Sequence, residues 1–132
     1  MTVGATLRSN EYAWTISSFP DAVALAVAHG YGCLGGQFQF RLADGSTCEM
    51  YWLNADSKER LEGESWLDYS RRSCLEVLEE FQKRLSETDF SKGAAKWRLP
   101  INFADDLVFV AYFVTETELA EISSQGADEA RS

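Results

Sequence analysis

Two alternating runs on either side of a turn occupy the middle of the chain: Gln37-Phe-Gln-Phe-Arg-Leu42, then Ala43-Asp-Gly45, then Ser46-Thr-Cys-Glu-Met-Tyr-Trp52. Such alternation is the pattern of a strand with one buried face. A three-residue turn with Gly45 in the left-handed conformation gathers the apolar side chains, Trp52 included, on that face. A two-residue turn would place Phe40 opposite Glu49 instead. The pairs predicted for this hairpin are Leu42–Ser46, Phe40–Cys48 and Phe38–Met50.

The segments around the hairpin predict the other strands of the sheet and the helices that pack on it. Residues 11–17 alternate weakly and predict a short strand, and Pro20 follows it in the first turn of a helix that ends at Gly30. Residues 106–114 are apolar on both alternating faces, which is typical of a central strand covered on both sides. A short helix over 116–122 follows.

A long helix is predicted from a cap at Ser65 to about Ser86. Its apolar stripe has the three- and four-residue spacing of a helix that packs on a sheet. The stripe consists of Leu67, Cys74, Leu78, Phe81 and Leu85. Together the elements predict an α+β fold, with a mainly antiparallel sheet around the central hairpin and one long and two shorter helices packed on it.

The length of 132 residues predicts a single domain over 1–122, and the small polar residues 123–132 predict a disordered tail. The N-terminal residues lack the basic start and apolar run of a secretory signal, and the longest apolar run, 107–114, is too short to cross a bilayer. We therefore expect a cytoplasmic protein. Three widely spaced cysteines, Cys33, Cys48 and Cys74, predict reduced thiols and no zinc site.

The excess of acid is large and uneven. The net charge is −9, with −4 in residues 44–64 and −6 in residues 105–132. A field of this sign repels nucleic acid and anionic membranes, and it attracts basic protein surfaces. The charge therefore predicts a binding protein for a basic partner, with no nucleic acid and no membrane as ligand; a monomer and a homodimer both remain open.

Candidate catalytic groups are few. His29 and Cys33 could form a base and a nucleophile, but that pairing would need a third residue to orient it, and we favour a helix-terminal histidine beside a buried thiol. The segment 30–36 has four glycines but matches no phosphate-binding motif, so we expect a tight helix-to-strand connection, which could also present Tyr31 and Leu34 to a partner. We expect no catalytic residue, no metal and no cofactor.

Aromatic side chains lie among the acids of 44–64, a combination that suits recognition of a basic protein. We expect Tyr51, Trp66 and Tyr69 to be exposed. Asp105 and Asp106 are expected at the start of a strand, where they point to opposite sides and guard an edge. The predicted partner-binding residues are Asp44, Glu49, Tyr51, Asp56, Glu59, Glu62, Glu64, Trp66, Asp105 and Asp106.

Three segments resemble those of small acidic bacterial immunity proteins encoded beside polymorphic toxins, in size, charge and general style. They are Tyr31-Gly-Cys-Leu-Gly-Gly-Gln-Phe-Gln-Phe-Arg41, Cys48-Glu-Met-Tyr-Trp-Leu53 and Arg72-Ser-Cys-Leu-Glu-Val-Leu78. The resemblance implies a stoichiometric inhibitor whose acidic, aromatic-containing face occludes the basic active-site cleft of a cognate toxin.

A second resemblance, to type III secretion chaperones, is based on small size, acidity and α+β composition. It implies binding of an effector chain and a dimer formed through the helix 65–86. Against it, such chaperones begin with a helix, whereas this chain is predicted to begin with a strand. A third class, an enzyme acting on a small molecule in a pocket of the fold, needs convergent polar groups in an apolar cavity, and the chain offers one histidine for that purpose.

Overall fold

The computed structural model describes residues 5–8, 11–42, 44–97 and 103–131. Along this part of the chain the elements are β1 (Thr6–Arg8), β2 (Glu11–Thr15), α1 (Phe19–Ala28), β3 (Gly32–Arg41), β4 (Thr47–Asp56), α2 (Trp66–Glu87), α3 (Phe90–Trp97), α4 (Phe103–Asp106), β5 (Leu107–Val114) and α5 (Glu116–Arg131).

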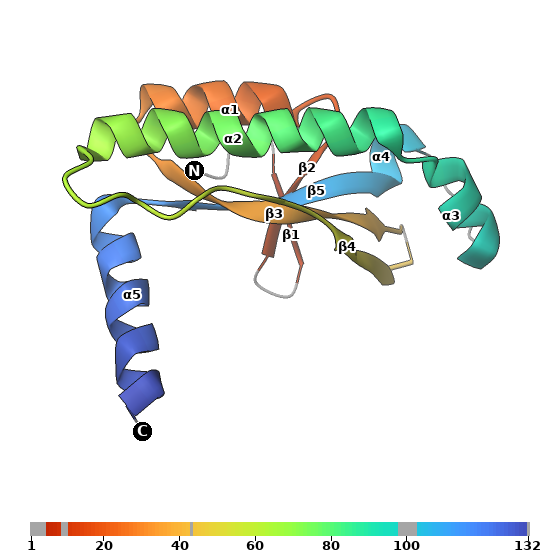
Figure 1. The fold of residues 1–132 in the computed structure, drawn as a ribbon. Helices are drawn as coiled ribbons and strands as arrows, with labels where there is room; N and C mark the ends of the chain where they lie inside the picture. The colour runs from red at the N-terminus through yellow and green to blue at the C-terminus, as the bar shows by residue number, and fades with distance from the viewer. Residues whose placement is uncertain (1–4, 9–10, 43, 98–102, 132) are drawn as a thin grey trace.

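The strands form one antiparallel sheet in the order β1-β2-β5-β3-β4, and α1 and α2 lie side by side across one of its faces (Figure 1). This arrangement confirms the predicted α+β fold. β5 lies between β2 and β3, and its first five residues, Leu107 to Ala111, are buried on both faces, as its apolar sequence predicts. α5 extends away from the body at the C-terminal end of β5 (Figure 1).

The central hairpin has the predicted register near its turn. Phe40 pairs with Cys48 and Phe38 pairs with Met50. The N–H of Leu42 donates to the carbonyl of Ser46 at 2.9 Å, and Gly45 has a φ of +94°. The left-handed glycine therefore closes the three-residue turn that the apolar pattern requires.

A bulge in β4 reverses the alternation beyond Met50. Phe38 pairs with Met50, but the preceding residue, Gln37, pairs with Asn54. Residues 51–53 therefore have no pairing residue on β3. Three extra residues, an odd number, exchange the two faces of the strand. Leu53 is therefore buried and Trp52 is 55% exposed, and the prediction that Trp52 lies in the core is wrong.

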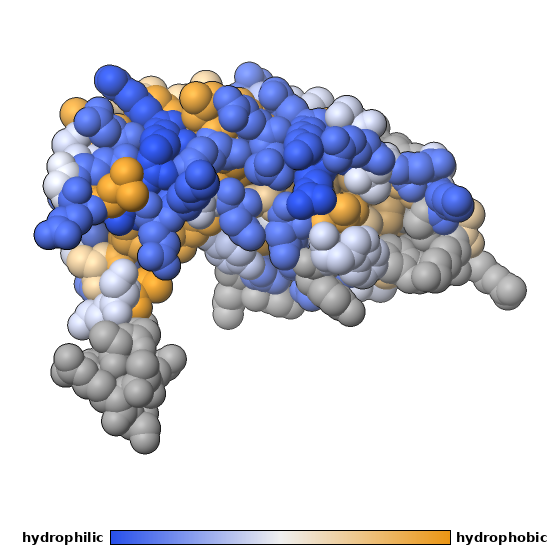
Figure 2. Space-filling model, in the orientation of Figure 1, coloured by the Kyte–Doolittle hydropathy of each residue, from blue (hydrophilic) through white to orange (hydrophobic). Residues whose placement is uncertain are grey.

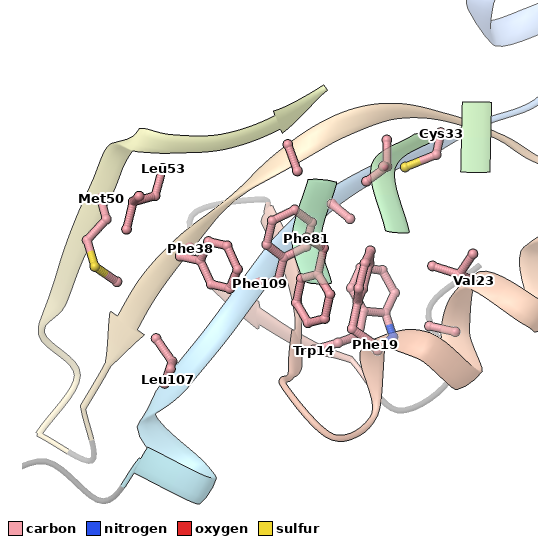
Figure 3. Close-up of a cluster of buried hydrophobic side chains, with 14 of the residues drawn as sticks. Trp14, Phe19, Val23, Cys33, Phe38, Met50, Leu53, Phe81, Leu107 and Phe109 are labelled. Atoms are coloured by element: carbon pink, nitrogen blue, oxygen red, sulfur yellow. The ribbon is translucent and has the colours of Figure 1, made fainter. Parts of the chain in front are cut away.

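The core between the sheet and the two helices is dominated by aromatic rings (Figure 3). Phe38 stacks on Phe81 of α2 at a centroid distance of 5.4 Å, and Phe19 of α1 contacts Phe109 of β5 at 4.6 Å. Trp14 completes the cluster from β2. Because the rings come from strands and helices far apart in the sequence, this cluster fixes α1 and α2 to the sheet.

The buried face of α2 is rotated from the predicted stripe. Cys74 and Phe81 are buried as expected, but Leu67 is 59% exposed. Two buried serines form hydrogen bonds with the backbone at the start of β3. Ser70 Oγ donates to the carbonyl of Tyr31 at 2.7 Å, and Ser73 Oγ accepts from the N–H of Cys33 at 3.0 Å. The helix therefore meets the sheet through short polar side chains that periodicity does not identify.

Arg41 connects strands that are not neighbours in the sheet. It is buried on the face opposite α1 and α2, where its Nη1 and Nη2 donate to the carbonyls of Thr6 and Glu11, both at 3.0 Å. Its Nε donates to Gln39 Oε1 at 2.8 Å. Since Arg41 belongs to β3 and Thr6 to β1, the sheet must curl to bring them together.

Several other elements differ from the sequence predictions, and the helix α3 was not predicted at all. β1 was not predicted, because three residues give too little periodicity. The glycines of 32–36 lie inside β3 instead of forming a connection. The C-terminal helix runs to Arg131 instead of ending at 122, and so takes in most of the predicted tail, which contains good helix formers and no proline. Asp105 and Asp106 lie in α4, before the strand.

Candidate functional site: the Leu34 groove

The predicted partner-binding residues fall at opposite ends of the sheet. Thr47 pairs with Arg41 at one end of β4, and Asp56 pairs with Gly35 at the other. A ten-residue strand is about 30 Å long, so no single small surface includes both ends. Asp44, Asp105 and Asp106 lie near the hairpin turn, whereas Asp56, Glu59, Glu62, Glu64 and Trp66 lie at the far end.

Two predicted residues lie between or outside these groups. Glu49 is exposed in the middle of β4, where it pairs with Gln39. The side chain of Tyr51 lies outside the part of the chain that the structure describes. At the turn, Asp44 Oδ1 accepts from the N–H of Ser46 at 2.8 Å and so supports the turn itself. Asp105 and Asp106 precede an interior strand, so their predicted role in guarding a sheet edge is wrong.

Glu64 is part of the internal structure of the acidic loop. Its carboxylate accepts two hydrogen bonds from Arg72 of α2, at 2.7 Å and 2.8 Å. Arg72 also donates to Glu76 and to the carbonyl of Glu59, the latter at 3.0 Å. The hydrogen bonds from Arg72 lower the pKa of Glu64 to about 2. Glu64 therefore anchors residues 57–65 to α2, and it is not a free partner-binding charge.

Trp66 and Arg60 fix the same loop on its other side. The indole Nε1 of Trp66 donates to the carbonyl of Gly30 at 2.7 Å, and the Arg60 guanidinium lies 5.3 Å from the Trp66 ring. Arg60 also forms an ion pair with Glu116 at 2.7 Å, at the start of α5. Trp66 is half-buried and Tyr69 is buried, so the prediction that Tyr69 is exposed is wrong.

Three adjoining pockets share Leu34, and we call them together the Leu34 groove. Leu34 is the extra residue where the register of β3 shifts against β5. The largest pocket, of about 420 Å³, lies between β5, β2 and α5. The second, about 290 Å³, lies beside Asp56 and Tyr112, and the third, about 400 Å³, lies between residues 57–60 and α5.

The groove combines exposed apolar side chains with carboxylates. Ile122 is 48% exposed and Tyr112 is 42% exposed. Asp56, Glu59 and Glu118 also line it. In Figure 2 hydrophobic surface gathers where α5 leaves the body. Apolar anchors inside a charged rim are the usual composition of a protein-binding surface.

Most groove residues were not predicted as partner-binding residues. Sequence reasoning found Asp56 and Glu59, and it raised Tyr31 and Leu34 as residues that the glycine-rich segment could present. It missed Tyr112 and Ile122, because they come from β5 and α5 and join the others through tertiary structure. Two signals were available in the sequence: the phenol of Tyr112 within an otherwise apolar strand, and Ile122 in an acidic helix.

Tyr112 has a further contact on the face opposite the helices. Its hydroxyl donates to the carboxylate of Glu11, which lies at the start of β2. Burial, followed by the hydrogen bond to Glu11 and the negative charge there, raises the pKa of Tyr112 to about 12. The phenol therefore stays protonated at neutral pH and acts as a hydrogen-bond donor.

The cysteine and histidine considered as catalytic groups lie in different environments. Cys33 is buried and its thiol pKa is strongly raised, first by burial and then by Cys74, whereas His29 is exposed at the end of α1. A raised pKa opposes formation of the thiolate that nucleophilic attack needs. Among the described residues, no group of three or more His, Cys, Asp or Glu could hold a metal ion.

Comparisons with protein-family models, with curated proteins and with solved structures found no match. Within the described ranges, no helix is both long enough and apolar enough to cross a membrane. The groove and its charge are therefore the basis for any statement about function.

Proposed function

We propose that this protein is an immunity protein, a stoichiometric inhibitor that binds a cognate bacterial toxin and occludes its basic active-site cleft. The observation that carries the proposal is the Leu34 groove. It sets Leu34, Tyr112 and Ile122 within a rim of carboxylates, on a chain of net charge −9. The apolar side chains supply contact area, and the charge favours fast capture of a basic protein.

The groove also has the rigidity that an inhibitor needs. Residues 57–60 form one wall, and Arg72 and Trp66 hold the loop 57–65 that contains them against α2. The Arg60–Glu116 ion pair connects that wall to α5. A preorganised site spends less of its interaction energy on ordering loops when it binds, which favours slow release of the toxin.

The test is co-expression with the product of the adjacent gene. That product should stop growth when expressed by itself, and it should copurify with this protein without killing the cell. Glu59→Lys with Glu62→Lys should weaken the complex more than tenfold, because both carboxylates are exposed: Glu59 lines the groove and Glu62 follows it in the same loop. Glu64 is left unchanged, because its replacement would release Arg72.

A matched control carries the same charge change on α2. Glu79→Lys with Glu87→Lys alters two exposed acids of the helix and should change the affinity less than threefold. Equal weakening by the two double variants would show that only net charge matters, and would refute the groove as the binding site. A toxic neighbour that this protein neither binds nor neutralises would refute the immunity function.

The secretion-chaperone alternative is favoured by one observation on α2. Leu67 and Leu75 are 59% and 56% exposed and lie two turns apart on the same side of the helix. Such a pair suits a helix-to-helix dimer contact. A dimer in solution that Leu67→Glu with Leu75→Glu dissociates, together with a harmless bound neighbour, would support this alternative.

A further inference from the structure

Within the described ranges, the C-terminal half of β5 pairs with β3 but with no strand on its other side. β2 pairs with β5 from Thr15 opposite Val108 to Ala13 opposite Val110. Tyr12 and Glu11 pair only with β1, along the other edge of β2. β3 follows β5 to its end, where Gly32 pairs with Val114. Among the described residues, the edge of 111–114 that faces away from β3 therefore has no strand partner.

The largest pocket of the Leu34 groove lies along this open edge. Its lining includes four consecutive residues of β5, from Ala111 to Val114. Successive residues of a strand point to opposite faces, so a pocket that touches all four reaches the edge of the strand. Tyr12 and Trp14 of β2 line it on the side away from β3, and Leu34 lines it from β3. Glu118 and Ile122 of α5 line the pocket too. The space therefore lies alongside strand backbone that pairs with no described strand on this side.

Two carboxylates lie at this edge, and Arg8 of β1 is the cross-strand neighbour of one of them, Glu11. Glu118 is the charged residue that lines the pocket, and Glu11 is held nearby by the Tyr112 hydroxyl. α5 carries five acids against Arg131, a net charge of −4. A second copy of this chain would bring a second acidic α5 towards the first, which like-charge repulsion opposes. A basic segment fits the same place.

We propose that the bound protein contributes an extended basic segment, which pairs as an added strand with the open edge of β5. In this arrangement an apolar side chain of the segment lies between Leu34 and Ile122, and Lys or Arg side chains lie against Glu118 and Glu11. The backbone hydrogen bonds of the added strand supply affinity, and the alternate side chains supply specificity. This inference rests on the proposed function and specifies the part of the partner that the groove recognises.

A synthetic octapeptide of alternating lysine and valine, blocked at both ends, tests the inference without the toxin. We expect about 1 mM peptide to slow hydrogen exchange at least tenfold at the amides of 111–114 that point away from β3, measured by NMR on the full chain. Two control peptides should give no protection. One carries glutamate in place of lysine, and the other has every amide nitrogen methylated and so cannot donate to a ladder.

A pair of variants on α5 tests the charge contact. Glu118 Oε1 accepts from the N–H of Thr115 at 2.9 Å, and the Thr115 hydroxyl accepts from the N–H of Glu118 at 3.2 Å. Glu118→Gln retains a capping acceptor while it removes the charge, and should weaken peptide binding at least threefold. Glu121→Gln, an exposed change on the same helix outside the groove lining, should alter binding less.

Three results would overturn the added-strand inference. The first is unchanged exchange at 111–114 with the lysine–valine peptide present. The second is equal binding of the methylated peptide, which would indicate apolar docking without a ladder. The third is protection that rises with protein concentration and needs no peptide, which would assign the edge to a second copy. Failure of the immunity function is a separate result, because the peptide can bind when no toxin is neutralised.

Discussion

Gly36→Ala is expected to destabilise the protein by about 3–5 kcal/mol, because the added Cβ atom would lie too close to neighbouring atoms. Gly36 lies in β3 opposite Ala111 of β5. A Cβ atom at this position would lie 1.9 Å from the carbonyl oxygen of Val110 and 2.6 Å from Cε1 of Phe109. The Val110 carbonyl belongs to the central strand, so it cannot rotate away as a flexible side chain would.

The size of the effect follows from how far the strands must separate. An ordinary C···O contact is about 3.3 Å, so relief of the 1.9 Å contact requires a displacement of about 1.4 Å. Such a shift takes neighbouring N–H···O bonds beyond hydrogen-bonding distance, and two lost bonds cost about 2 kcal/mol. Overpacking against Phe109 adds about 1–3 kcal/mol.

Urea unfolding followed by tryptophan fluorescence measures the change. With a slope of about 1.5 kcal/mol per molar urea, we expect the midpoint to fall by about 2–3 M. Gly45→Ala is the control: Gly45 has a φ of +94°, but a Cβ atom added there would have no neighbour within 4 Å, so only backbone conformation opposes the substitution. That cost is about 1–2 kcal/mol. A Gly36→Ala midpoint equal to or above that of Gly45→Ala would refute the close-approach argument.

Three further predictions concern titrating groups. Because the pKa of Glu64 is about 2, below the ordinary carboxyl value of about 4.3, its contribution to stability is complete above the ordinary value and is lost as pH falls towards 2. The difference in urea midpoint between wild type and Glu64→Gln should therefore be constant above about pH 5 and close towards pH 2; a constant difference throughout contradicts the Arg72 contact. The phenolate absorbance of Tyr112, obtained as wild type minus Tyr112→Phe, should appear near pH 12 and move lower in Glu11→Gln, and its contribution to stability should fall as pH rises from about 10 through 12. A thiol reagent should modify Cys48 in the folded protein but reach Cys33 and Cys74 only after unfolding, because burial raises the pKa of both; rapid loss of all three thiols would contradict the buried positions.

The local parts of the fold could be predicted from the sequence. The hairpin register depends on alternation and on one turn glycine, both of which lie within residues 37–50. The long helix begins at Ser65, whose hydroxyl accepts from the N–H of Asp68 at 3.2 Å, as its cap predicted. The position of Trp52 could not be predicted, because no residue marks where β4 departs from its partner.

The candidate site was less accessible to sequence reasoning than the fold. The acid-rich composition predicted the sign of the surface charge. It did not predict which carboxylates form hydrogen bonds within the protein. Glu64 differs from Glu62 chiefly in its contact with Arg72, which lies eight residues further along the chain on α2. Likewise, Leu34 and Ile122 line the same pocket because β5 ends beside β3 and continues into α5, and this depends on strand order.

The bulge at residues 51–53 has a consequence for how the protein behaves at high concentration. β4 is an outer strand of the sheet, and a straight outer strand is a template on which other chains can aggregate. The bulge interrupts the regular spacing of backbone donors and acceptors near the middle of β4. An incoming strand could match only a short part of β4 on either side of it. The sheet is thereby protected against edge-to-edge aggregation along its longest exposed border.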